Sequence, residues 1–132
     1  MTDPSDLFAT IMARETAQAP ERCTQQLARN ADLMREAGAR LRALAPPFAA
    51  TLARGSSDHA AAFAKVLLET RASVPTLSHA PSIGSLYGVT SAHFRNVPLI
   101  AISQSGRSPD LIAAAQDAKR QGALLIAIVN DA

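Results

Sequence analysis

Two short segments rich in serine and glycine have the residue types that could bind an anion. Small side chains let an anion approach the backbone, where N–H and hydroxyl groups can donate hydrogen bonds to it. We name residues 55–57 the first serine loop and residues 103–108 the second serine loop. Phosphate binding is the chemistry that they serve most naturally. The first loop is Gly55-Ser56-Ser57, and the second begins with Ser103-Gln104-Ser105-Gly106.

The second serine loop lies between a predicted strand and a predicted helix. Residues 97–102 are apolar without polar alternation, which is typical of a strand buried on both faces of a parallel sheet. Ser108 is a candidate N-cap, and Pro109 fits the first position of a helix that runs to Gln121. Asp110 places a carboxylate in the first turn of this helix. The positive end of the helix dipole would then face the loop.

The first serine loop has the same setting. Residues 48–54 predict a strand before it and residues 58–70 a helix after it, and two further strands are predicted at 73–78 and 123–129. This alternation predicts an α/β fold with right-handed crossovers and a parallel sheet. Ligands of such sheets bind beyond the carboxyl ends of the strands, where the strand order reverses. Neighbouring first and third strands would therefore bring both loops into one composite site.

The residues before the first strand predict helices. We expect one helix over residues 6–19 and a longer one over 20–44, with Pro20 in its first turn. This divides the chain into an N-terminal helical segment, residues 1–46, and an α/β domain, residues 47–132. Cys23 falls on an apolar helical stripe and is predicted to be a buried thiol. It is the only cysteine, so the chain forms no internal disulfide.

Composition excludes several classes of function. The chain has 132 residues, with 13 basic and 11 acidic residues mixed along it, so no basic patch predicts a nucleic-acid partner. The first twenty residues have no apolar signal core, and no apolar run is long enough to span a membrane, so we expect a cytoplasmic protein. Nothing in the sequence names a metal or redox cofactor. Residues 123–129 predict a buried strand close to Ala132, which favours either a longer natural chain or a partner that completes the sheet.

Several motifs together resemble the sugar isomerase (SIS) domain, in its glucosamine-fructose-6-phosphate aminotransferase-like branch. Residues 53–57, Ala-Arg-Gly-Ser-Ser, are similar to the A-C-G-T-S loop of that family. Residues 102–108, Ile-Ser-Gln-Ser-Gly-Arg-Ser, are similar to its L-S-Q-S-G-E-T loop. Met12 and Glu15, followed by Gln18-Ala19-Pro20, resemble the M-x-x-E-I-x-x-Q-P helix of the branch.

The resemblance implies a three-layer, doubly wound parallel sheet with a flavodoxin-like strand order. It also implies that the phosphate of a sugar phosphate is held by Ser103, Gln104, Ser105 and Ser108, and that the same ligand is met from the first loop by Gly55, Ser56 and Ser57. Arg54 stands where the family has cysteine, and Arg107 where it commonly has glutamate. A solvated side chain is the simpler interpretation of each arginine, although Arg107 could also contact phosphate. The family's catalytic acid and base residues belong to a second SIS half, which would follow Ala132, so the resemblance implies no catalytic residue within this chain. Its histidines, His59, His79 and His93, are acid or base candidates by residue type alone.

The implied function is that of a sugar-phosphate isomerase or an amino-sugar-phosphate deaminase or aminotransferase. Such an enzyme moves protons on an open-chain hexosamine or ketose 6-phosphate, works as a homodimer and requires no cofactor. Thr2 stands where the glutamine-hydrolysing enzymes of the branch have a nucleophilic cysteine, so ammonia would not come from glutamine. Two alternatives remain: a non-catalytic sensor that binds a sugar phosphate, and a domain whose serine loops serve only as turns.

Overall fold

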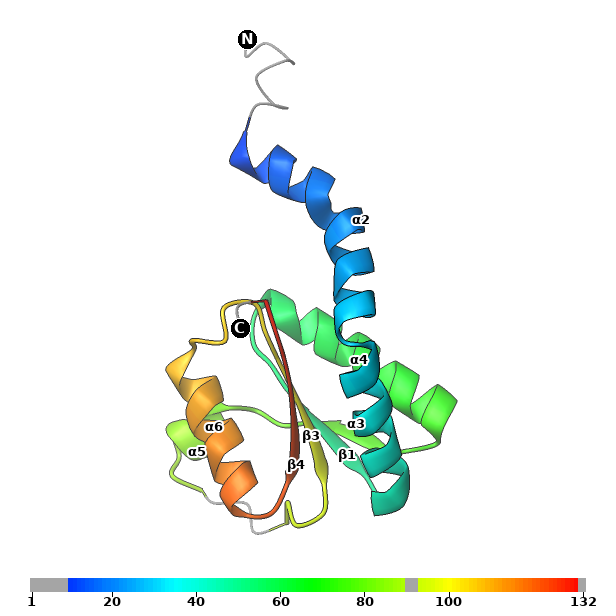
Figure 1. Cartoon of the computed structure of the whole chain (residues 1–132). Coiled ribbons are helices and arrows are strands. Elements are labelled where there is room, and N and C mark those ends of the chain that lie inside the picture. The colour runs from blue at the N-terminus through cyan, green and yellow to red at the C-terminus, as the bar shows by residue number, and fades with distance from the viewer. Residues whose placement is uncertain (1–9, 90–92, 131–132) are drawn as a thin grey trace. The chain divides into compact units, whose positions relative to one another are not determined.

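The computed structural model describes residues 10–89 and 93–130 (Figure 1). The chain divides into two compact units, Met1–Arg40 and Leu41–Ala132. None of the described helices is sufficiently long and apolar to cross a membrane.

Two helices, α2 (Ile11–Arg29) and α3 (Ala31–Leu44), precede the sheet. The predicted helix start at Pro20 is wrong, because α2 continues through this residue. A proline inside a helix removes one backbone hydrogen bond and bends the axis without necessarily ending it. The interruption lies instead at Asn30, whose N–H still donates to the Gln26 carbonyl at 3.0 Å. Residues 6–9 of the first predicted helix lie outside the described residues.

The prediction of a buried Cys23 is also wrong, since this residue is exposed. No residue of α2 or α3 is buried, and Leu27 and Met34 are 63% and 52% exposed. An apolar stripe indicates which side of a helix could be covered, but it does not identify the surface that covers it. The stripe therefore predicted the helices and not the burial of their side chains.

The α/β prediction is confirmed by a four-stranded, fully parallel sheet of order β2-β1-β3-β4. Its β1 and β3 are neighbours, as the composite-site argument requires. The strands are β1 (Ala49–Leu52), β2 (Thr76–Ser78), β3 (Pro98–Ser103) and β4 (Leu124–Val129), and the helices among them are α4 (Ser56–Ala72), α5 (Ser82–Ser85) and α6 (Pro109–Arg120).

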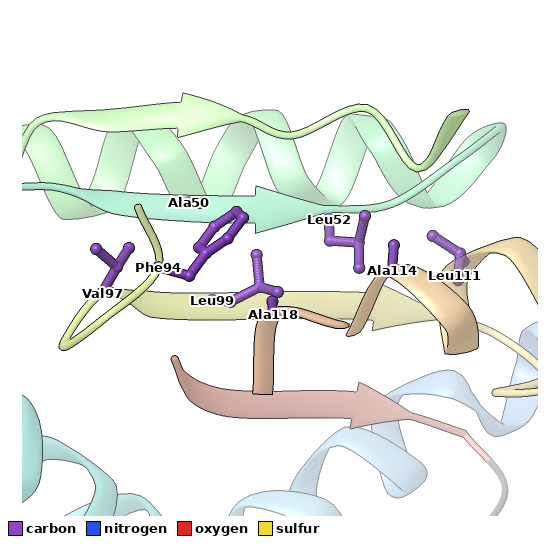
Figure 2. Packing of buried hydrophobic residues seen from close by; sticks show 8 residues of the cluster. All are labelled: Ala50, Leu52, Phe94, Val97, Leu99, Leu111, Ala114 and Ala118. Carbon is purple, nitrogen blue, oxygen red and sulfur yellow. The ribbon is translucent and has the colours of Figure 1, made fainter. Parts of the chain in front are cut away.

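The helices form layers on both faces of the sheet (Figure 1). Because alternate strand residues point to opposite faces, Leu52 and Leu99 face α6 while Ile100 faces α4. The main core lies between β1, β3 and α6, and Figure 2 shows its side chains converging between these elements. Its buried members are Ala50, Leu52, Phe94, Val97, Leu99, Leu111, Ala114 and Ala118.

The prediction of β4 as a buried strand is wrong. Its first three residues are half-buried and its last three are exposed, with Ile128 at 44% and Val129 at 36%. In the described sheet β4 pairs with β3 alone and forms one edge. An apolar run predicts a strand, whereas burial depends on what packs beside it, and here only one side of the strand has a neighbour.

His79 packs against Phe94, a buried residue of the core. Its backbone N–H donates to the Thr51 carbonyl at 2.8 Å, and its ring meets Phe94 edge-on at a centroid distance of 5.0 Å. Burial lowers the pKa of His79, and the negative charge of Asp117 opposes this effect only in part. This environment assigns His79 a packing role.

The lowered pKa of His79 predicts that acid weakens the fold. At pH values between the pKa of His79 in the folded chain and its value of about 6.5 in the unfolded chain, the unfolded chain binds more protons. The free energy of unfolding therefore has its full value above this pH range and falls as the pH decreases through it. Urea unfolding measured from about pH 7 to about pH 5 should show this decrease, and His79→Gln should reduce its slope. His59→Gln, which alters an exposed histidine, is the control. An unchanged slope in His79→Gln would contradict the assignment.

Candidate phosphate-binding site

The two serine loops leave adjacent strands at the same edge of the sheet. Leu52 near the end of β1 is in register with Ala101 of β3, so the loops that follow both emerge at the carboxyl edge. Helices α4 and α6 begin directly after them, at Ser56 and Pro109. Two helix N-termini, each with a positive dipole end, therefore lie beside this edge. The structure thus brings together the segments that contain all seven predicted residues.

Gly55, the first residue of the first serine loop, is the N-cap residue of α4. Its φ of +59° and ψ of −136° belong to a region that residues with a Cβ rarely adopt. As the N-cap residue it provides no side-chain hydrogen bond to the helix. Ser56 is exposed and Ser57 half-buried. The first turn of α4 thus has an uncapped N-terminus where an anion can be accommodated.

Hydrogen bonds within the second serine loop orient two of its hydroxyl groups. The Ser103 Oγ accepts from the Gly106 N–H at 3.1 Å, and the Ser105 Oγ accepts from the Arg107 N–H at 3.3 Å. Because a hydroxyl can accept and donate together, both serines keep a proton to donate to a ligand. Gly106 has a φ of +65°, which suits this tight turn.

The second serine loop ends at the N-cap of α6, and one of its carbonyl groups accepts a hydrogen bond from the residue that follows β4. Ser108 is the N-cap residue of α6 and Pro109 occupies its first turn, as predicted, but the Ser108 side chain makes no capping hydrogen bond. Its hydroxyl is therefore not used by the helix. The Asn130 N–H donates to the Gln104 carbonyl at 3.2 Å and connects the loop to the end of β4. Gln104 and Ser105 are exposed, whereas Ser103 and Ser108 are half-buried.

An ion pair joins the first strand–helix connection to the second. The Arg54 Nη1 donates to the Asp110 Oδ2 at 2.9 Å, across 56 residues of sequence. Burial would raise the pKa of Asp110, but the hydrogen bond from Arg54 and the N–H groups of the first turn of α6 outweigh it and lower the pKa. Sequence reasoning treated Arg54 as a solvated side chain and missed this partner. Only the opposite charges were visible in the sequence, and they do not indicate which residues meet.

The three histidines are acid or base candidates by residue type alone. His59 and His93 are exposed, and His79 packs on the core. Within residues 10–89 and 93–130, no group of three histidine, cysteine or carboxylate side chains could hold a metal ion. A cavity of about 390 Å³ lies elsewhere, at the amino ends of β1 and β3. It is lined by Leu41, Arg42, Ala45, Pro46, Ala49, Leu68, Ala72, Ser73, Val74, Pro98 and Ile100.

A parallel sheet with two serine loops beyond adjacent carboxyl ends defines an α/β protein of the flavodoxin-like strand order. The family model described as "SIS domain" matches residues 49–132, which is more than half of the chain. The chain therefore belongs to the SIS domain family.

Similar proteins have been described in other organisms. A glutamine–fructose-6-phosphate aminotransferase (isomerizing) of Halobacterium salinarum is 39% identical over 79 residues, covering 60% of this chain and 13% of that protein. A crystal structure of a candidate phosphosugar isomerase from Silicibacter pomeroyi is 37% identical with a TM-score of 0.84, covering 89% of this chain and 36% of that one. This chain thus spans a minor part of either relative.

A more distant structure supports the fold alone. A candidate phosphosugar isomerase involved in capsule formation in Bacteroides fragilis has a TM-score of 0.58 at 18% identity. It covers 86% of this chain and 64% of that one.

The backbone of Gly55 predicts a cost for any side chain at this position. A Cβ at Gly55 would meet no atom within 4 Å, so Gly55→Ala should destabilise through backbone strain alone. We expect the free energy of unfolding to fall by about 1–3 kcal/mol. Gly84→Ala is the matched control, because Gly84 lacks a positive φ and its Cβ would lie an ordinary 3.9 Å from the Val89 carbonyl. Equal unfolding free energies for the two variants in urea would refute the argument.

Proposed function

We propose that this chain is the phosphosugar-binding domain of an enzyme that isomerises or deaminates a sugar phosphate. The observation that supports this most directly is the pair of serine loops at adjacent strand ends, where Ser103 and Ser105 keep hydroxyl protons to donate. The N-terminus of α4, whose N-cap residue makes no side-chain hydrogen bond, supplies further donors, and the dipoles of α4 and α6 add positive potential at the same edge. A phosphate group needs such a set of convergent donors around its oxygens.

The similar proteins support the class of substrate. The Halobacterium relative is named for fructose 6-phosphate, and the Silicibacter structure for a phosphosugar isomerase. We therefore propose a hexosamine or ketose 6-phosphate as the ligand, with Gly55, Ser56, Ser57, Ser103, Gln104, Ser105 and Ser108 holding its phosphate. The named relatives are enzymes, so the comparisons do not favour a non-catalytic sensor.

The proposed reaction is proton transfer on the open-chain sugar. A base removes a proton from the carbon beside the carbonyl group, and an acid returns one to the neighbouring carbon. The described residues at the carboxyl edge are suited to binding and not to this proton transfer, because serine and glutamine side chains are poor bases at neutral pH. We propose that this chain anchors the phosphate while residues outside it supply the acid and the base.

Ligand-dependent stabilisation tests the phosphate site. Fructose 6-phosphate or glucosamine 6-phosphate at about a hundred times its dissociation constant should stabilise the complete protein by about 2.7 kcal/mol, seen as a raised unfolding temperature. Unphosphorylated glucosamine should give little shift, because the loops contact the phosphate. The Ser103→Ala/Ser105→Ala variant should lose most of the stabilisation. Equal shifts with the phosphorylated and unphosphorylated sugars would reject the proposed site.

We propose that the protein forms a homodimer through the exposed face of α4. Phe63, Val66 and Leu67 are 64%, 53% and 42% exposed, and their spacing places them on one side of the helix. Exposed apolar side chains that adjoin one another are typical of protein interfaces. A second copy that presents the same face could bury both stripes around a two-fold axis.

Light scattering tests this assembly. We expect the complete protein to have twice the mass of one subunit, and Phe63→Glu/Val66→Glu to have the mass of one, because a buried apolar contact cannot accommodate unpaired charges. Ile112→Glu, which alters an apolar α6 residue that is 40% exposed, is the control. A dimer that persists in the double variant would exclude α4 as the interface.

A further inference from the structure

We propose that Arg54 is a phosphate-binding residue, aimed at the ligand by Asp110. This inference rests on the proposed function and adds a charged residue to the seven candidate binding residues, which are serines, one glutamine and one glycine. Arg54 lies next to Gly55, and Asp110 lies in the first turn of α6, two residues after Ser108. Their ion pair therefore places the guanidinium between the beginning of the first serine loop and the end of the second.

The hydrogen bond to Asp110 uses only one of the N–H donors of Arg54. A guanidinium group has five N–H donors in a planar fork that matches the oxygens of a phosphate. Asp110 takes one hydrogen bond, at Nη1, and the Arg54 side chain is 59% exposed. Arg54 can therefore keep this bond and still donate to a ligand that enters from solvent.

Asp110 limits the freedom of this long side chain. The Asp110 side chain is only 27% exposed, and N–H groups at the start of α6 hydrogen-bond to its carboxylate. A carboxylate held in this way is a fixed anchor, whereas a solvated arginine samples many rotamers. Part of the ordering cost of binding is thus met before the ligand arrives, which is how preorganisation increases affinity.

Charge balance at the site supports the same assignment. An ionised Asp110 beside a phosphate site would repel the anion, and Arg54 offsets that charge. If Arg54 served only to offset the charge of Asp110, it would need its contact with Asp110 but no hydrogen bond to the ligand. The two roles make different predictions in a variant that lacks the Asp110 charge. In that variant Arg54 has no carboxylate charge to offset, so any remaining effect of Arg54 on binding comes from its own contact with the ligand.

The test measures the dissociation constant of fructose 6-phosphate by calorimetry on the complete protein, in four forms: wild type, Arg54→Met, Asp110→Asn and the double variant. Arg54→Met should raise the dissociation constant about 10-fold to 100-fold, the range for hydrogen bonds to a charged group. In the Asp110→Asn background, Arg54→Met should also raise the dissociation constant by at least about fivefold. A smaller increase in that background overturns the inference, since Arg54 would then act only by offsetting Asp110.

A second ion pair on α6 provides the matched control. Arg120 and Asp117 lie 3.1 Å apart with side-chain exposures of 68% and 28%, close to the 59% and 27% of Arg54 and Asp110, but at the opposite end of the helix. Arg120→Met should leave the dissociation constant unchanged. If it weakens binding as much as Arg54→Met does, the effect is not specific to the site and the inference is wrong.

The experiment separates this inference from the proposed function. Wild-type binding that is lost in Ser103→Ala/Ser105→Ala but retained in Arg54→Met would leave the phosphate site standing and overturn the role of Arg54. Absence of binding by the wild-type protein to fructose 6-phosphate and glucosamine 6-phosphate would overturn both. Unfolding temperatures of all variants, measured without ligand, show whether each one is folded.

Discussion

The parallel pairing of β1 with β3 is the constraint on which the rest of the structure depends. These strands are far apart in sequence, and beyond them the chain proceeds in opposite directions, to β2 on one side and to β4 on the other. Right-handed crossovers then place α4 and α6 on opposite faces of the sheet. Both helices begin at the carboxyl edge, so their N-termini and the serine loops before them lie next to each other.

The two edges of the sheet have different chemistry. At the amino edge, a cavity is lined mainly by apolar side chains from α3, α4 and the strand beginnings. At the carboxyl edge, glycines with positive φ form tight turns, and neither α4 nor α6 has a side-chain cap. Backbone donors at the start of α4 that a cap would otherwise satisfy can bind an anion, which is the physical basis for proposing a phosphate at this edge.

Charge at the carboxyl edge is arranged across the β1–β3 boundary. Arg54 follows β1, and Asp110 belongs to the helix that follows β3, yet they form an ion pair of 2.9 Å. An ion pair with one largely exposed partner contributes little to fold stability. Its importance lies in position, since it sets a cation beside the serine loops and offsets a carboxylate that would otherwise oppose an anionic ligand.

The sequence by itself determined the features that depend on neighbouring residues. Apolar runs predicted the strands, Ser108 and Pro109 predicted the start of α6, and the serine loops marked the candidate site, because strand period and helix capping act over a few residues. Only the tertiary structure decided that β4 lies at an edge, that Cys23 is exposed and that Arg54 meets Asp110. Burial and ion pairing depend on which distant segments pack together, and local sequence patterns do not specify that packing.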